Sequence, residues 1–120
     1  MTEIQTSIET LDISGKNAKL IKFVGQLDET NVDEEAKKIY QLLEEEKDLS
    51  LVIDLTGLTY MNSKSIGYLT DWYTKINETG GKMVITGAQE NILDVLSVVG
   101  LTNIIEHFSS LEEAKNALAE

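Results

Sequence analysis

The stretch that most constrains the fold lies between residues 51 and 67, where an apolar run passes through a polar turn into a helical pattern. The run Leu51–Ile53 is apolar and rich in β-branched residues, which is typical of a strand buried inside a sheet. Short polar side chains follow at residues 62–65. Apolar side chains then recur at helical spacing: Ile66, Leu69, Tyr73 and Ile76. The sequence therefore predicts a buried strand that leads through a turn into a helix beginning near Ser63.

The start of that helix is the first candidate for a functional site. A helix N-terminus offers backbone N–H groups without intrahelical acceptors and the positive end of the helix dipole. Asn62 and Ser63 also belong to the residue types that cap helices, so their side chains can serve the helix alone. A simple cap and a binding or modification site are both consistent with these residues.

Patterns along the remaining chain predict strands that alternate with helices. Period-two alternation marks the first strand, and a turn cluster at residues 14–17 indicates that it forms a hairpin with the second. The strands are expected at residues 3–12, 18–24, 51–54, 82–85 and 104–105. The first helix is expected to begin at a cap formed by Thr30 or Asn31, with Glu34 completing a capping box, and to end near Lys47. Two further helices are expected at residues 63–77 and 92–99. The last helix is expected to begin at a cap formed by Ser109 or Ser110, with Glu113 in the capping-box position.

This order, ββαβαβαβα, predicts an α/β fold in which a mixed β-sheet is flanked by about four α-helices. Function in such sheets gathers outside the carboxyl ends of the parallel strands. We therefore expect the loops at Gly25–Asp28, Thr56–Ser63 and Gly87–Gln89 to meet at one end of the sheet. The residues expected to form the core together are Val52, Ile53, Ile66, Leu69, Val84 and Ile85.

Length and charge limit the possible functions. The chain has 120 residues, so a single domain spanning residues 1–120 is expected. Its net charge is −11, and all ten of its basic residues are lysines. An acidic chain without arginine is poorly suited to nucleic acid or to an anionic membrane surface, because both require phosphate neutralisation. The polar N-terminus lacks the features of a signal peptide, and no apolar run is long enough to span a bilayer, which predicts a cytoplasmic protein.

Few residues offer catalytic chemistry. The chain has no cysteine and a single histidine, His107, and it lacks the glycine motifs that bind nucleotides. Asp28 and Asp54 lie where strands end, and such a pair can hold a metal or act as acid and base. The acids of a response-regulator receiver are not assembled around them. We therefore predict a non-enzymatic protein without a cofactor.

Aromatic side chains gather on the predicted helix 63–77. Tyr73 falls on its apolar face, whereas Tyr68 and Trp72, spaced i and i+4, form a ridge beside it. These side chains either belong to the core and its edge or form an exposed ridge that would suit a protein partner.

The segment DLTGLTYMNSKSIGYL resembles the central signature of the STAS domain family, the sulfate transporter and anti-sigma factor antagonist domains. Three further segments resemble family motifs in the same order along the chain. They are Gly25–Asp28, which resembles Gly-Glu-Leu-Asp; Gly80–Ile85, which resembles two glycines before a strand; and Val99–Leu101 followed by Ile104–Ile105, which resembles Gly-Leu before a strand.

The resemblance implies an anti-sigma factor antagonist, a protein-interaction switch in bacterial transcription regulation. Such a protein binds an anti-sigma factor that is also a serine kinase, which releases it after phosphorylating a serine at the start of the helix; a serine phosphatase is a further implied partner. Ser63 matches that serine. The implied partner-binding residues are Gln26, Asp28, Asn62, Ser63 and Lys64.

Three residues beside this serine depart from the family pattern. Asn62 replaces the usual aspartate, Lys64 replaces a small hydroxyl residue, and Ser65 replaces glycine. Ser65 and Thr59 are therefore alternative phosphate acceptors. The resemblance also allows a second function, a ligand- or lipid-linked STAS module such as a subunit of a transport assembly, with a persistent apolar pocket and no phosphorylation switch.

Overall fold

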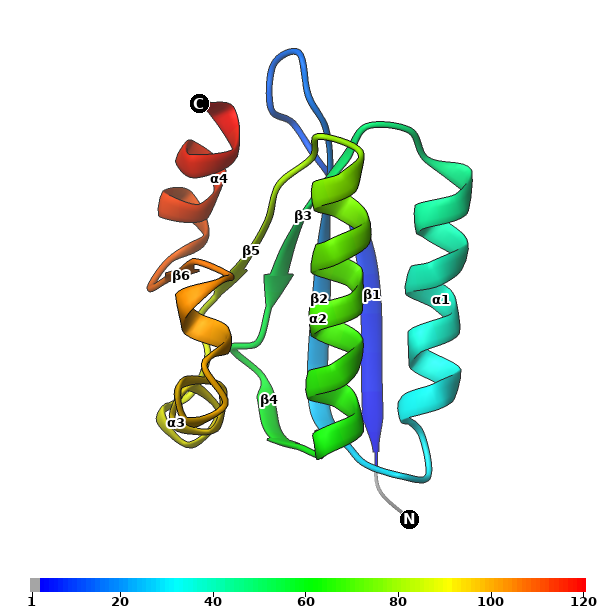
Figure 1. Ribbon diagram of the computed structural model, residues 1–120, viewed down its shortest axis with the longest axis vertical. Helices are drawn as coiled ribbons and strands as arrows, with labels where there is room; N and C mark the ends of the chain where they lie inside the picture. Colours follow the sequence, from blue (N-terminus) through cyan, green and yellow to red (C-terminus); the bar gives the residue numbers. More distant parts are fainter. Residues whose placement is uncertain (1–2) are drawn as a thin grey trace.

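The computed structural model describes residues 3–120 and contains one mixed sheet with helices on both faces (Figure 1). Within these residues the strands are β1 (Ile4–Leu11), β2 (Asn17–Leu27), β3 (Leu49–Asp54), β4 (Leu58–Met61), β5 (Met83–Thr86) and β6 (His107–Phe108). The helices are α1 (Val32–Glu45), α2 (Ser63–Glu78), α3 (Glu90–Val98), the 3₁₀ turn η1 (Leu101–Asn103) and α4 (Leu111–Ala119).

The sheet has the strand order β1-β2-β3-β5-β6, and β4 lies beside the second half of β2. β1 pairs with β2 in an antiparallel hairpin, whereas all other pairs are parallel. This arrangement confirms the predicted α/β fold with a mixed sheet and four α-helices. The element order contains one strand more than predicted, because β4 forms between β3 and α2.

Alternate residues of the central strands pack into two separate clusters. Ile53 and Ile85 face α1, α2 and α3, where Leu69 also lies. Val52 and Val84 face the opposite side, where they contact residues of α4. Burial on both faces explains why these strands are apolar along their whole length. The six predicted core residues therefore do not form one core, because Val52 and Val84 belong to the cluster that faces α4. The other four lie in or against the cluster on the opposite face, where Ile66 is only partly buried.

The end of β2 differs from the prediction that residues 25–28 form a loop. Gly25, Gln26 and Leu27 continue the strand, because β4 supplies a parallel partner for them. Gly25 lies at a register shift with φ +117°, and a Cβ there would be 2.3 Å from the backbone oxygen of Glu3. Glycine is thus required both by the backbone conformation and by the close approach of β1.

The predicted strand at residues 104–105 is wrong. The last strand is β6, and Ile104 and Ile105 follow η1 in a turn. Ile105 is buried in the core and its N–H donates to the Leu101 oxygen, whereas Ile104 is 52% exposed. The two adjacent isoleucines suggested a strand, but only Ile105 is buried, and it lies in a turn.

One predicted helix cap is confirmed and another is wrong. Ser110 caps α4 and its side chain accepts a hydrogen bond from the Glu113 N–H, as predicted. Asn31 is the N-cap residue of α1, but its side chain does not cap the helix, so the predicted capping box with Glu34 is absent. The Asn31 amide instead accepts from the Asp28 N–H and donates to the Gln26 oxygen, holding the loop that precedes the helix. α1 ends at Glu45, slightly before the predicted position.

The aromatic side chains of α2 belong mainly to the core and do not form an exposed ridge. Trp72 is buried, and its ring stacks between those of Phe23 and Tyr68, with centroids 6.1 Å apart in each pair. Tyr68 and Tyr73 are half-buried against the same cluster.

The position of Ile53 yields a stability prediction. Its side chain is fully buried between β3 and the helices, so Ile53→Ala should lower the free energy of unfolding by about 2–5 kcal/mol. Ile104→Ala, the same substitution at a half-exposed position, should change it by no more than about 0.5 kcal/mol. Urea unfolding monitored by circular dichroism measures both; equal effects would contradict the central placement of β3.

Candidate functional site

The segments that follow β2, β4 and β5 lie at one end of the sheet, the lower end in Figure 1. The Asn62 N–H donates to the Leu27 oxygen at 3.1 Å and so fixes the start of α2 beside the end of β2. On the other side of β4, the Gln89 side chain donates to the Thr56 oxygen at 2.9 Å. This confirms that the three predicted loop regions lie at the same end of the sheet.

Asn62, not Ser63, caps α2. Its Oδ1 accepts hydrogen bonds from the Ser65 N–H at 2.9 Å and from the Ser65 hydroxyl at 2.6 Å. Ser63 is therefore the first residue of the helix, and its side chain is exposed. Among residues 3–120, its hydroxyl forms no hydrogen bond. The cap and the accessible hydroxyl are thus supplied by two different residues.

The two alternative hydroxyls are less available than that of Ser63. Ser65 is 2% exposed, and its hydroxyl is bound to Asn62. Thr59 is exposed, but its hydroxyl donates to the Gly25 oxygen at 3.1 Å. Phosphorylation of Ser65 would require the first turn of α2 to open, and phosphorylation of Thr59 would break a link between β4 and β2.

A charged cluster joins the first turn of α1 to the first turn of α2. The Lys64 ammonium lies 2.8 Å from Oδ1 of Asp33, and the Tyr68 hydroxyl donates to the same oxygen at 2.6 Å. The hydrogen bonds from Lys64 and then Tyr68 lower the pKa of the Asp33 carboxyl, and the bond to Asp33 raises the pKa of Lys64. All three groups are in contact with solvent, so the ion pair contributes little to stability. Its effect is to orient Lys64 toward α1.

Gln26 and Asp28 lie beside the start of α2 but have different environments. The Gln26 side chain is exposed, and the residue pairs with Tyr60 of β4. Asp28 is half-buried, and its Oδ1 accepts hydrogen bonds from the Thr30 N–H at 2.9 Å and the Thr30 hydroxyl at 2.5 Å. Asp28 therefore stabilises the turn into α1 as well as lying near Asn62.

The remaining candidates for chemistry have structural roles. Oδ1 of Asp54 accepts from the Thr56 N–H at 2.9 Å, and Nε2 of His107 accepts from the Ala88 N–H at 3.2 Å. Partial burial lowers the pKa of His107. Across residues 3–120, no group of three or more potential metal-binding side chains is found. In the same residues, no helix is both long and apolar enough to cross a membrane.

Comparison with known proteins identifies relatives of the same fold. The sequence model of the STAS domain family matches residues 9–114 of this chain. An anti-sigma-B factor antagonist of Listeria monocytogenes is 29% identical over 72 residues, which cover 60% of this chain and 60% of the relative.

Two solved structures extend the likeness in fold over nearly the whole chain. An anti-sigma factor antagonist from Mycobacterium paratuberculosis matches with a TM-score of 0.79 and 23% identity, over 98% of this chain and 96% of the other. The phosphorylated form of the Bacillus cell fate determinant SpoIIAA matches with a TM-score of 0.69 and 16% identity, over 94% and 98% of the two chains.

Because Asn62 supplies the cap and Ser63 the accessible hydroxyl, substitutions of these two residues should affect stability differently. Asn62→Ala removes the cap and should lower the free energy of unfolding by about 0.5–2 kcal/mol, whereas Asn62→Asp retains an acceptor for the same N–H. Ser63→Ala removes no hydrogen bond seen within residues 3–120 and should change it by no more than about 0.5 kcal/mol. Thermal and urea unfolding compare the three variants; a larger loss in Ser63→Ala than in Asn62→Ala would assign the cap to Ser63.

Proposed function

The chain belongs to the STAS domain family, and on that premise we propose that it is an anti-sigma factor antagonist controlled by phosphorylation of Ser63. In this proposal it acts in the cytoplasm as a binding protein without catalytic activity. Its partner is an anti-sigma factor with serine-kinase activity, and a serine phosphatase restores the unmodified form. The observation that carries the proposal is the exposed hydroxyl of Ser63 at the first position of α2.

A phosphate on Ser63 is compatible with the fold. The backbone N–H groups of Ser63 and Lys64, at the first two helical positions, have no intrahelical acceptors and can bind phosphate oxygens. The helix dipole favours an anion there by typically 0.3–1 kcal/mol. Asn62 keeps the cap intact with a neutral amide, so the phosphate is not placed beside a carboxylate at that position.

The same phosphate opposes binding of the partner. It adds about −1.5 to −2 charges at a surface that the partner must desolvate. A desolvated charge without a matched counter-ion costs several kcal/mol, and a kinase with its nucleotide in place presents like-charged phosphates nearby. The switch therefore works through the interface and leaves the fold unchanged.

The proposed partner surface is the end of the sheet around Ser63. Its members share this end of the sheet and are exposed or half-buried: Gln26, Asp28, Asn62, Ser63 and Lys64. The relative from Listeria carries the name anti-sigma-B factor antagonist, which supports an anti-sigma factor as the class of partner.

The switch predicts opposite outcomes for two substitutions of one residue. Ser63→Asp should keep the melting temperature of the parent but weaken binding of the nucleotide-bound partner at least tenfold, a change of about 1.4 kcal/mol. Ser63→Ala should bind as the parent does and incorporate no phosphate. Calorimetric titration and kinase assays measure both effects. Phosphate incorporation that persists in Ser63→Ala, or parent-like binding by Ser63→Asp, would refute the proposed switch.

The position of the partner surface can be tested with two identical changes of charge. Gln26→Lys introduces an ammonium at this end of the sheet that the partner would have to desolvate, and it should weaken binding at least tenfold if the partner covers this end. Gln41→Lys places the same charge on an exposed residue in the C-terminal half of α1 and should bind within about twofold of the parent. Equal losses in the two variants would indicate a general charge effect and would contradict the proposed surface.

A further inference from the structure

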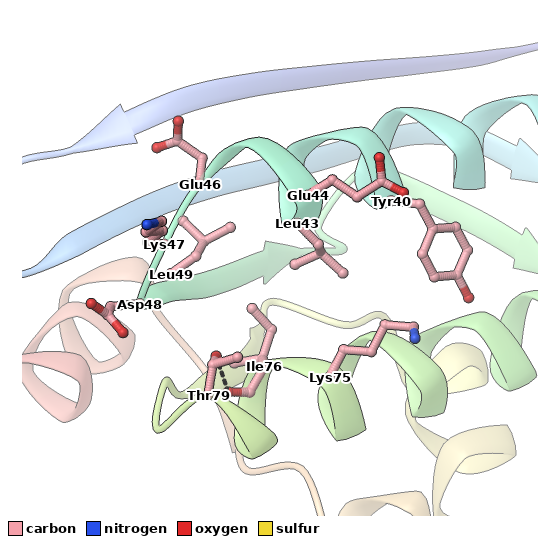
Figure 2. Close-up of a pocket in the computed structure, with 10 residues that line it drawn as sticks. All are labelled: Tyr40, Leu43, Glu44, Glu46, Lys47, Asp48, Leu49, Lys75, Ile76 and Thr79. Atoms are coloured by element: carbon pink, nitrogen blue, oxygen red, sulfur yellow. Dashed lines mark hydrogen bonds between the residues drawn. The ribbon is translucent and has the colours of Figure 1, made fainter.

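A pocket lies between the C-terminal halves of α1 and α2, at the end of the sheet opposite Ser63 (Figures 1 and 2). Its volume is about 520 Å³, which falls in the range of small-molecule sites in proteins. The Leu43 side chain from α1, Leu49 at the start of β3 and Ile76 from α2 converge on it, and the Tyr40 ring lies at one side. Most of its surface is therefore apolar.

The pocket exists because the connection from α1 to β3 turns sharply. α1 ends at Glu45, and Asp48, the only non-glycine residue with positive φ in residues 3–120, then directs the chain into the sheet at φ 53°. This turn buries Leu49, whereas Leu43 on the last turn of α1 stays partly exposed. Apolar surface of Leu43 is left uncovered by any other part of residues 3–120.

Two lysines line this pocket without a counter-ion. Across residues 3–120, neither Lys47 nor Lys75 forms an ion pair, whereas Lys22, Lys38, Lys64 and Lys115 each do. Asp71 stands four residues before Lys75, the usual spacing for a pair on a helix. The Asp71 carboxylate accepts a hydrogen bond from the Tyr40 hydroxyl, and no ion pair joins it to Lys75.

The positively and negatively charged side chains around the pocket point in different directions. Figure 2 shows that Lys75 extends from α2 toward the Tyr40 ring, along the pocket. The carboxylates of Glu44 on α1 and of Glu46 just after this helix project away from α2, and Asp48 lies at the far end. The ammonium of Lys75 is thus the charge that a ligand lying against Leu43 would meet first.

We infer that this pocket binds a small amphiphilic carboxylate with an unbranched apolar tail. The tail covers the exposed part of Leu43 and lies against the Tyr40 ring, and the carboxylate pairs with the Lys75 ammonium. A wholly polar ligand would leave the apolar walls in contact with water. A dianionic phosphate would be repelled more strongly than a monoanion by the three carboxylates around the pocket. The inference concerns a site distant from Ser63 and does not depend on the proposed switch.

Titration with three probes that each carry an eight-carbon chain tests this inference: octanoate, octanol and octyltrimethylammonium, each below its solubility limit and any micellar concentration. Chemical shifts of backbone amides, measured by NMR, identify the binding site. Octanoate should give saturable shifts at residues 40–49 and 75–80 and should bind more tightly than either other probe. The net charge of −11 favours the cationic probe everywhere else, so preference for the anion must come from the pocket.

Substitution of Lys75 tests whether its own ion pair with the carboxylate, and not the overall charge of the protein, determines octanoate binding. Lys75→Met should weaken octanoate binding on the order of three- to fivefold, and Lys75→Arg should retain it. Lys37→Met removes another exposed lysine that lies outside the pocket and forms no ion pair with any residue from 3 to 120, and it should leave the affinity unchanged. Unsaturable or dispersed shifts, equal affinity for the cationic probe, or equal effects of Lys75→Met and Lys37→Met would each overturn the inference.

Discussion

The parallel pairing of β4 with the last residues of β2 is the contact on which the candidate site depends. It carries the chain from the central strand β3 back beside Leu27, so that the Asn62 N–H reaches the Leu27 oxygen and α2 begins there. The pairing requires β2 to extend past Gly25, where only glycine fits beside the backbone of β1. Without β4, the turn before α2 would have no fixed position relative to the β2–α1 loop. The geometry around Ser63 is therefore a consequence of sheet pairing, not of the helix alone.

The division of roles between Asn62 and Ser63 gives this site its chemical character. Asn62 satisfies the Ser65 N–H and holds the first turn, so Ser63 is not needed for the stability of the helix. A hydroxyl without a structural role can be modified without loss of the fold, while the helix terminus beside it favours the added anion. Lys64 is oriented by Asp33 in the neighbouring helix, and the same carboxylate also binds Tyr68. The charges beside the Ser63 hydroxyl are thus fixed by contacts between α1 and α2.

The sequence allowed prediction of the features that rest on local periodicity, and it failed where tertiary contacts decided the structure. The apolar run of β3, the spacing of α2 and the cap at Ser110 are local signals, and each was confirmed. β4 is four residues long with exposed Thr59 and Tyr60 at its centre, so only its pairing with β2 reveals it. Asn31 looked like a cap because asparagine often is one, but its amide is used by the preceding loop. Which hydroxyl near residue 63 is available also depended on burial, which spacing does not determine.

In the proposed switch, phosphate on Ser63 separates this protein from its partner. The most direct measurement is peptide-mapped mass spectrometry of the protein isolated from its own cells, after the partner-bound and free fractions have been separated under native conditions. We expect phosphate on Ser63 in the free fraction and none on Ser63 in the bound fraction. Equal phosphate on Ser63 in both fractions, or phosphate carried only by another residue such as Thr59, would contradict it.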